Sequence, residues 1–275
     1  MLAETIASAS RSPAAIRRSI LEMLHRARAS HLGPCMSVVE ALAAIYASVD
    51  LEPIRRRARD RSRVIVSKGH CAAAVYATLA HYGLLSFDQL QSYCADGSLL
   101  AGHVSHAVDG VEHSTGALGH GLPVACGCAF GLRNLRADHS HVYCLVGDGE
   151  MQEGSNWEAI MLAAHHRLSN LTLLVDSNRI SSITATANVI NLFPLEDRFQ
   201  AFGWTPYAVD GHSPAAIADT LARIRHRGEL AAVVCNTIKG YGVPFAENQP
   251  IWHYRSLNDD LFQQALTNLD EAVRS

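Results

Sequence analysis

Two polar motifs that could hold a metal ion follow two short apolar runs. The tripeptide Gly-Asp-Gly at 147–149 comes directly after the run 142–146, and Asn178 follows the next run, 171–175. A carboxylate and an amide oxygen suit a hard cation such as Mg²⁺ and not zinc. Two such ligands leave coordination positions for a backbone carbonyl, water and phosphate oxygens, which is how Mg²⁺ usually holds a diphosphate. The flanking glycines let the backbone approach that ligand closely.

A strand, a helix and a second strand must position these groups. The run 142–146 is too short for a buried helix and is typical of a strand buried on both faces, as in a parallel sheet. Residues 153–167 carry apolar side chains at helical spacing. The resulting βαβ unit places Asp148 and Asn178 just past the carboxyl ends of neighbouring strands, where open α/β sheets bind ligands. An ordinary Asp-Gly turn is the alternative for Gly-Asp-Gly alone, and the placement of Asn178 argues against it.

A glycine-rich segment, 110–131, is the second chemical signal. It contains Ser-Thr-Gly at 114–116 and Leu-Gly-x-Gly at 118–121, followed by a helix of small residues, 122–132. Glycines at the start of a helix can form a nest of backbone N–H groups for an anion. A dinucleotide-binding loop is the other candidate. The spacing is not G-x-G-x-x-G, however, and no acidic residue follows a strand about 20 positions later, which disfavours it.

Composition limits the function classes. A chain of 275 residues with 48% apolar content can bury one large core, and we predict a single domain, 1–275. A net charge of −3 lacks the excess of positive charge that is typical of nucleic-acid-binding proteins. No apolar run approaches the 18 residues of a membrane span. The N-terminal segment lacks the apolar region of a signal peptide. Seven cysteines in mostly apolar surroundings indicate reduced thiols and a cytoplasmic protein.

Taken together, these motifs resemble the thiamine diphosphate fingerprint. The segment GDGEMQEGSNWEA, which begins at Gly147, specifically resembles the N-terminal half of transketolases. The likeness extends over nearly the whole chain. It implies an α/β thiamin-diphosphate-binding fold, in which a parallel β-sheet is flanked by helices on both faces and the domain binds the diphosphate of the cofactor.

The resemblance also implies thiamine diphosphate and Mg²⁺ as cofactors, with Ca²⁺ or Mn²⁺ as substitutes for the magnesium. The metal ligands would be Asp148, Asn178 and the backbone carbonyl of Ile180. The implied cofactor contacts are His70, Gly116, Ala117, Leu118, Gly147, Asp148, Gly149, Glu150, Asn178, Ile180 and His253.

Four histidines and one glutamate complete the implied active site. The histidines would bind substrate hydroxyls and move protons, and the glutamate would contact a glutamate of the partner and couple the two sites. These residues are His31, His70, His103, His253 and Glu153. The match departs from the family in three places. Ser30 and Leu32 replace the glycine and proline of Gly-His-Pro-Gly, Val104 replaces a proline, and Ser-Ser-Ile-Thr at 181–184 replaces Gln-x-Asp-Gly. The last change leaves the fit of the substrate open.

The chain matches only the diphosphate-binding half of a transketolase. The other half-site holds the aminopyrimidine and supplies a glutamate to it. We therefore predict the N-terminal subunit of a split transketolase, active with a C-terminal, pyrimidine-binding subunit in an α₂β₂ heterotetramer. It would transfer a two-carbon ketol unit from a ketose to an aldose or other acceptor. Two alternatives stay open: a related thiamine diphosphate enzyme that acts on a 2-oxo acid, and a non-catalytic scaffold subunit. The residues do not identify the natural donor or acceptor.

Overall fold

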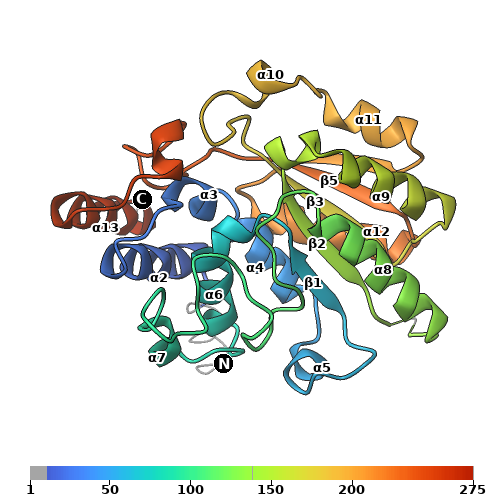
Figure 1. The fold of residues 1–275 in the computed structure, drawn as a ribbon, viewed down its shortest axis with the longest axis horizontal. Helices are drawn as coiled ribbons and strands as arrows, with labels where there is room; N and C mark the ends of the chain where they lie inside the picture. Colours follow the sequence, from blue (N-terminus) through green and yellow to red (C-terminus); the bar gives the residue numbers. More distant parts are fainter. Residues whose placement is uncertain (1–10, 138, 275) are drawn as a thin grey trace.

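The computed structural model describes residues 11–137 and 139–274 (Figure 1). Residues 1–10 and 275 lie outside the described residues. The prediction about a signal peptide and the two ends of the predicted domain, 1–275, fall on them. Within the described residues no helix is long and apolar enough to cross a membrane.

Within the described residues, five parallel strands form one sheet in the order β1-β2-β3-β5-β4. The strands are β1 (Arg63–Val66), β2 (Val142–Gly147), β3 (Leu171–Ser177), β4 (Thr205–Asp210) and β5 (Ala231–Asn236). In the pairing of β2 with β3, Val142 lies opposite Leu171 and Gly147 lies opposite Asp176. The predicted strand–helix–strand unit and its two adjacent strand ends are therefore confirmed.

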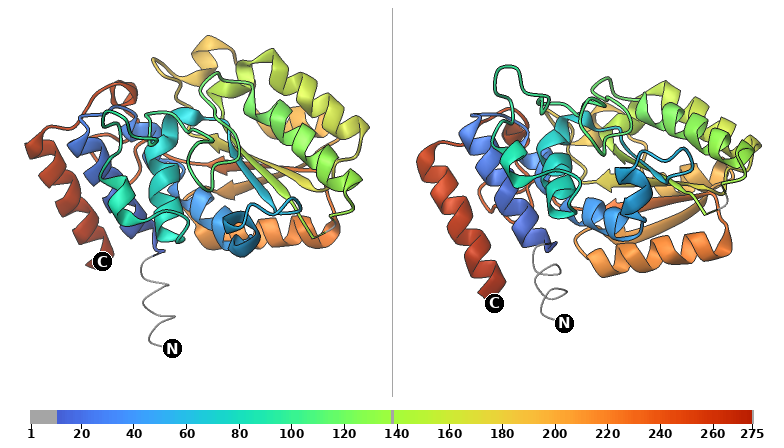
Figure 2. Two further views of the ribbon diagram at one scale, coloured as in Figure 1. Left: turned by 60° about the horizontal axis from the view of Figure 1, so that its bottom comes forward. Right: turned by 90° about the horizontal axis from the view of Figure 1, so that it is seen from below.

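Helices cover both faces of the sheet, as the right panel of Figure 2 shows for α8 and α9 on one side and α12 on the other. The α-helices are α2 (Pro13–Arg26), α3 (Leu32–Met36), α4 (Val39–Ala47), α5 (Leu51–Arg55), α6 (Ala72–His81), α7 (Phe87–Leu90), α8 (Gly121–Asn134), α9 (Gly154–His165), α10 (Thr186–Val189), α11 (Leu195–Ala201), α12 (Pro214–Arg227) and α13 (Asp259–Arg274). Short 3₁₀ turns are η1 (Gly69–Cys71), η2 (Gly149–Gln152) and η3 (Pro250–His253). Helix α2 packs against α6, and α13 packs on the outer side of α2.

Strand β2 illustrates why the apolar runs are uninterrupted. Tyr143 and Leu145 point into the core beneath α2, α4, α6 and α12, whereas Cys144 and Val146 point into the core beneath α8, α9 and α11. Successive side chains of a strand alternate between faces, and both faces of this sheet are covered. Each position must therefore be apolar until the strand reaches the ligand edge.

The structure differs from prediction at two helices. The segment Ser-His-Leu-Gly-Pro at 30–34 is typical of a loop by its glycine and proline. The chain nevertheless becomes helical at Leu32, and α3 buries Leu32, Cys35 and Met36 completely or nearly so. Pro34 lies in the first turn of α3, where its missing N–H breaks no helical hydrogen bond. The second difference is α13, for which no motif was recognised. Its buried residues Ala265 and Leu269 belong to the same core as α2.

We predict that two glycines of α8 respond oppositely to substitution by alanine. Gly121 donates its N–H to Ser67 Oγ at 3.0 Å, and a Cβ at this position would overlap the Ser67 side chain. Gly121→Ala should lower the free energy of unfolding by about 1–3 kcal/mol through overpacking. Gly127 has open space around it, so Gly127→Ala should raise that free energy by about 0.5–1 kcal/mol. Urea unfolding measures both changes, and equal effects would contradict the packing argument.

Candidate functional site

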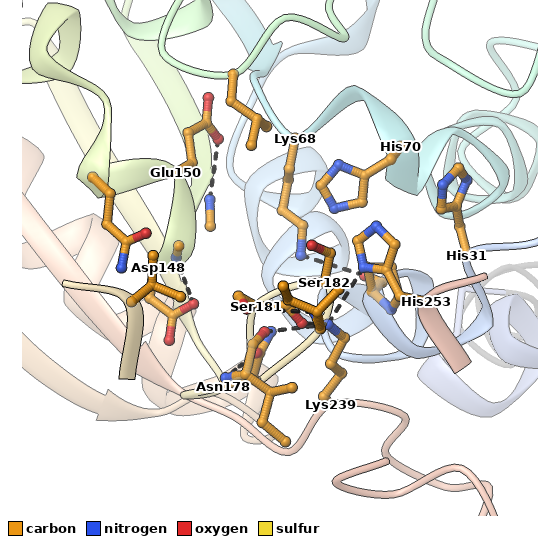
Figure 3. Close-up of a pocket in the computed structure, with 18 of the residues that line it drawn as sticks. His31, Lys68, His70, Asp148, Glu150, Asn178, Ser181, Ser182, Lys239 and His253 are labelled. Atoms are coloured by element: carbon orange, nitrogen blue, oxygen red, sulfur yellow. Dashed lines mark hydrogen bonds between the residues drawn. The ribbon is translucent and has the colours of Figure 1, made fainter. Parts of the chain in front are cut away.

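A pocket of about 450 Å³ opens where the strands of the sheet end (Figure 3). It gathers residues from the ends of β1, β2, β3 and β5, together with residues at the start of α3, in the loop before α8 and in η3. The sequence-predicted residues that line it are His31, His70, His103, Gly116, Leu118, Gly147, Asp148, Gly149, Glu150, Glu153, Asn178, Ile180 and His253. Ala117 is exposed and is not among the lining residues.

Asp148 follows β2 and is almost completely buried. Its Oδ1 accepts the N–H of Gly149 at 2.7 Å, and its Oδ2 accepts the N–H of Arg179 at 2.6 Å. Burial, and next the charge of Asp176, raise the pKa of Asp148 to about 6. A cation beside this carboxylate would stabilise the charged form and offset that cost.

Asn178 lies at the end of β3, beside Asp148, with its amide held at both ends. Its Nδ2 donates to Asp176 Oδ2 at 3.0 Å, and its Oδ1 accepts the N–H of Ile180 at 3.1 Å. The carbonyl of Ile180 accepts a bond from Lys239 at 3.2 Å. The oxygens of Asp148, Asn178 and Ile180 each keep an unused lone pair, so the donor set fits a hard cation.

In the described part of the chain, no group of three or more His, Cys, Asp or Glu residues could hold a metal ion by itself. A cation at Asp148 and Asn178 would therefore depend on water and on oxygens of a bound ligand for its other positions. This is the way Mg²⁺ is bound together with a phosphate ligand.

A buried ion pair, which the sequence analysis missed, lies beneath the pocket. Lys68 follows β1 and Asp176 belongs to β3, and each side chain is about 2% exposed or less. The Lys68 ammonium donates to Asp176, which also accepts bonds from Ser37 Oγ at 2.7 Å and from Thr237 Oγ1. Although burial opposes both charges, the attraction to its partner raises the pKa of Lys68 and lowers that of Asp176. Both groups are therefore charged at neutral pH.

A second buried lysine, Lys239, points into the pocket from the loop after β5. Its ammonium donates to the carbonyl of Ser181 at 2.6 Å and lies 3.4 Å from His253 Nδ1. Burial, and next repulsion from Lys68, lower the pKa of Lys239 to about 8. Because neutral groups hold this ammonium, it can attract an anion in the pocket. Lys68 and Lys239 are the only lysines of the chain. The rarity of lysine is the feature of the sequence that could have marked both as candidate site residues.

The predicted histidines form one cluster, and Figure 3 shows His31, His70 and His253 on the other side of the pocket from Asp148. The ring of His31 lies 5.6 Å from that of His70, 5.5 Å from that of His103 and 5.3 Å from that of His253. Burial lowers the pKa of His31 to about 4 and that of His253 to about 3, and it lowers the pKa of His70 as well. At neutral pH these three rings are uncharged, so His31 and His70 each offer one donor and one acceptor to a ligand hydroxyl. In His253, Nδ1 accepts from the Lys239 ammonium, so Nε2–H is left as a donor.

The two glutamates have different environments. Glu150 is buried and accepts bonds from Ser67 Oγ, from the N–H of Gly119 at 2.9 Å and from the N–H of Gly147 at 3.2 Å. It therefore braces the ends of β1 and β2 against the glycine-rich loop. Glu153 is exposed at the rim of the pocket, at the start of α9.

We predict that the buried ion pair is necessary for the fold. Lys68→Met leaves the Asp176 carboxylate buried without a counter-charge, and it should lower the free energy of unfolding by about 3–5 kcal/mol. The double variant Lys68→Met/Asp176→Asn removes both charges and should recover more than half of that loss. Urea unfolding at pH 7 decides between the outcomes. A double variant as unstable as the single one would mean that packing, and not the unpaired charge, causes the loss.

The lowered pKa values of His31 and His253 predict a dependence of stability on pH. The unfolded chain binds protons at these histidines near pH 6.5, whereas the folded chain binds them only near pH 4 or below. Their contribution to stability is therefore present above about pH 6.5 and is lost as the pH falls toward 4. In ¹³C-histidine NMR, both Cε1 signals should stay at their neutral position down to about pH 5. The chain unfolded in urea is the control, and titration of the folded signals near 6.5 would contradict the burial argument.

Comparison with known proteins identifies the family. Residues 8–270 match the family model described as "Transketolase, thiamine diphosphate binding domain". The chain is 38% identical to one subunit of the apulose-4-phosphate transketolase of Actinobacillus succinogenes, over 94% of each chain. It is 33% identical to the 6-deoxy-6-sulfo-D-fructose transketolase subunit of a Clostridium species, over 93% of this chain and 94% of the relative.

Longer transketolases match over part of their length. Human transketolase is 30% identical over 94% of this chain, but the match covers 42% of the human protein. The crystal structure of transketolase from Campylobacter jejuni superposes with a TM-score of 0.86 at 26% identity, over 95% of this chain and 42% of that one. The predicted thiamin-diphosphate-binding fold is thus confirmed, and the chain belongs to the transketolase N-terminal, thiamine diphosphate-binding family.

Proposed function

We propose that this chain is the N-terminal subunit of a split transketolase. With a second subunit it binds thiamine diphosphate and Mg²⁺ and transfers a two-carbon ketol unit from a ketose to an aldose or other acceptor. The observation that carries this proposal is the division of the pocket. The oxygens of Asp148 and Asn178 lie on one side, neutral histidines on the other, and the Lys239 ammonium between them (Figure 3).

The anionic end of the cofactor would lie at the strand ends. Asp148, Asn178 and the carbonyl of Ile180 would hold Mg²⁺, and Lys239 would neutralise part of the diphosphate charge. Gly116, Leu118 and Gly149 would shape the channel next to it. When bound, thiamine diphosphate supplies the electron sink that permits cleavage of a carbon–carbon bond.

The histidines would handle the sugar. His31, His70 and His253 are neutral at pH 7 and lie close together. The rings of His31 and His70 can each donate to one hydroxyl and accept a proton from another, and His253, whose Nδ1 accepts from Lys239, can donate from Nε2. His103, whose ring is 5.5 Å from that of His31, would extend this surface. Glu153, exposed at the rim, would face the partner subunit.

Two observations support a partner that completes the site. Relatives of the same length are named as single subunits of a transketolase, whereas one-chain transketolases are more than twice as long. In addition, the pocket wall exposes apolar side chains, with Ile183 73%, Val189 50% and Tyr254 59% exposed. A C-terminal, pyrimidine-binding subunit would cover these side chains in a heterotetramer with two copies of each subunit. Residues 1–275 would act as one domain, in a cytoplasmic setting that keeps the seven cysteines free.

Calorimetry tests the cofactor assignment. The chain is expressed alone and together with the product of the adjacent reading frame, and thiamine diphosphate is added with Mg²⁺ or with EDTA. Tight binding that requires both Mg²⁺ and the partner supports the proposal. Full binding by this chain alone would contradict the need for a second half-site.

Asp148→Ala should weaken the Mg²⁺-dependent binding of thiamine diphosphate by on the order of 100-fold, because it removes the charged metal ligand. Asp219→Ala is the matched control, since Asp219 lies on α12 and does not line the pocket. Wild-type affinity in the Asp148 variant would refute the metal assignment.

A donor panel tests the reaction. It should compare ketose phosphates and 6-deoxy-6-sulfo-D-fructose, chosen from the names of the relatives, with pyruvate as a 2-oxo acid. Transfer from a ketose without turnover of pyruvate is the expected result. Turnover of pyruvate alone would favour the 2-oxo acid enzyme instead.

A further inference from the structure

A second buried ion pair lies behind the pocket and joins α2 to α4. Arg17 on α2 and Glu40 on α4 are 4% and 2% exposed. Arg17 Nη1 donates to Glu40 Oε1 at 2.6 Å, and Nη2 donates to Oε2 at 2.8 Å. Although burial opposes its charge, bonds from His212 and Arg17 lower the pKa of Glu40. Neither member of the pair is among the residues that line the pocket.

The pair is connected to one loop, residues 237–243, directly through Arg17 and indirectly through His212. Arg17 Nε donates to the carbonyl of Tyr241 at 3.2 Å. His212, which follows β4, has Nδ1 3.4 Å from Glu40 Oε2, and its Nε2 accepts the N–H of Ile238 at 2.8 Å. Because Nε2 accepts, the ring proton is assigned to Nδ1, facing Glu40. The His212 ring also stacks on Tyr241, with 3.6 Å between the ring centroids. We call Arg17, Glu40 and His212 the clamp.

Lys239 lies between the loop positions that the clamp holds. Ile238 on one side is bound by His212, and Tyr241 on the other is bound by Arg17. Between them, Gly240 donates its N–H to the carbonyl of Gly33 at 3.0 Å. Gly240 has φ +85°, and a Cβ there would overlap the backbone of Ala246. The backbone on both sides of Lys239 is therefore fixed, and its side chain leaves the loop in one direction.

We propose that Arg17, Glu40 and His212 are positioning residues, which hold the Lys239 ammonium at the anion-binding end of the pocket. An ion pair that only joined α2 to α4 would not need the bonds from Arg17 Nε and to His212 Nε2, and both of these go to the same loop. Among the residues that the structure describes, the Lys239 ammonium forms hydrogen bonds only with backbone carbonyls and a histidine, so the loop, and not an ion pair, determines where it lies. The identity of the anion, the diphosphate of thiamine diphosphate, rests on the proposed function.

Two substitutions of His212 separate positioning from general loss of structure. In His212→Gln the amide oxygen can take the place of Nε2 and accept the N–H of Ile238. In His212→Asn the shorter side chain leaves that N–H unpaired. We expect His212→Asn to raise the Kd for thiamine diphosphate in the Mg²⁺-loaded complex about tenfold. We expect His212→Gln to stay within about threefold of wild type.

The double variant His212→Asn/Lys239→Met shows whether the effect passes through Lys239. If it does, the double variant binds no more weakly than Lys239→Met alone. Additive losses, or a wild-type Kd for His212→Asn, would overturn the inference. If His212→Asn does not fold, Arg17→Lys is the second variant. Lysine can keep a bond to Glu40 but lacks the Nε donor for Tyr241. The same results are expected of it, and the same results would overturn the inference.

A spectroscopic measurement distinguishes failure of this inference from failure of the proposed function. With ¹³C-lysine labelling the chain has two lysine Cε signals, and the Lys239→Met variant assigns them. His212→Asn should move the Lys239 signal and leave the Lys68 signal in place, and His212→Gln should move neither. Absence of thiamine diphosphate binding in the wild-type complex refutes the proposed function, and the Lys239 signal still decides the inference. An unmoved Lys239 signal in His212→Asn overturns it.

Discussion

The buried contact between Lys68 and Asp176 is the constraint on which the ligand edge of the sheet depends. Every residue of β3 is buried, so a carboxylate there is costly unless a cation and hydrogen-bond donors meet it. The cation comes from the end of β1, and the donors come from Ser37 and from Thr237 after β5. Asp176 thus draws the ends of three strands and the segment before α4 to one point. Because Asp176 also orients the amide of Asn178, the position of this candidate metal ligand follows from the ion pair.

The charges of the pocket are arranged by solvent exclusion as much as by pairing. Burial disfavours the charged form of Asp148 and of the histidines alike, so one carboxylate becomes receptive to a cation and the imidazoles become neutral. The Lys239 ammonium lies among backbone carbonyls, and burial lowers its pKa. The same physical effect therefore produces a site for a metal and an anion at one end, and a neutral hydrogen-bonding surface at the other.

Local pattern was sufficient to predict the strand–helix–strand unit formed by β2, α9 and β3, and the two residues that meet at its ligand edge. The run 142–146 and the run after it predicted β2 and β3, and their adjacency brought Asp148 and Asn178 together. Periodicity does not report partners, which is why Asp176 and Lys239 were missed. The hydrogen-bond partners of the Asp176 and Lys239 side chains lie at least 58 positions away in the chain. Asn178, a partner of Asp176, and His253, a partner of Lys239, are the exceptions. The helix at Leu32 was missed for a related reason, since burial against the core and not local propensity places it.

The position of β5 in the sheet determines when the sheet can be completed during synthesis of the chain. β4 pairs with β5 and not with β3, so it has no strand neighbour until β5 has been synthesised. Until then, β3, which is fully buried in the folded protein, is an unpaired edge strand of the nascent chain. Such an edge can pair with strands of other chains. Insertion of β5 closes that edge and in the same step delivers the loop that carries Lys239. Completion of the sheet therefore precedes completion of the pocket, which also needs His253 of η3, and a chain interrupted on the ribosome before residue 236 would have neither.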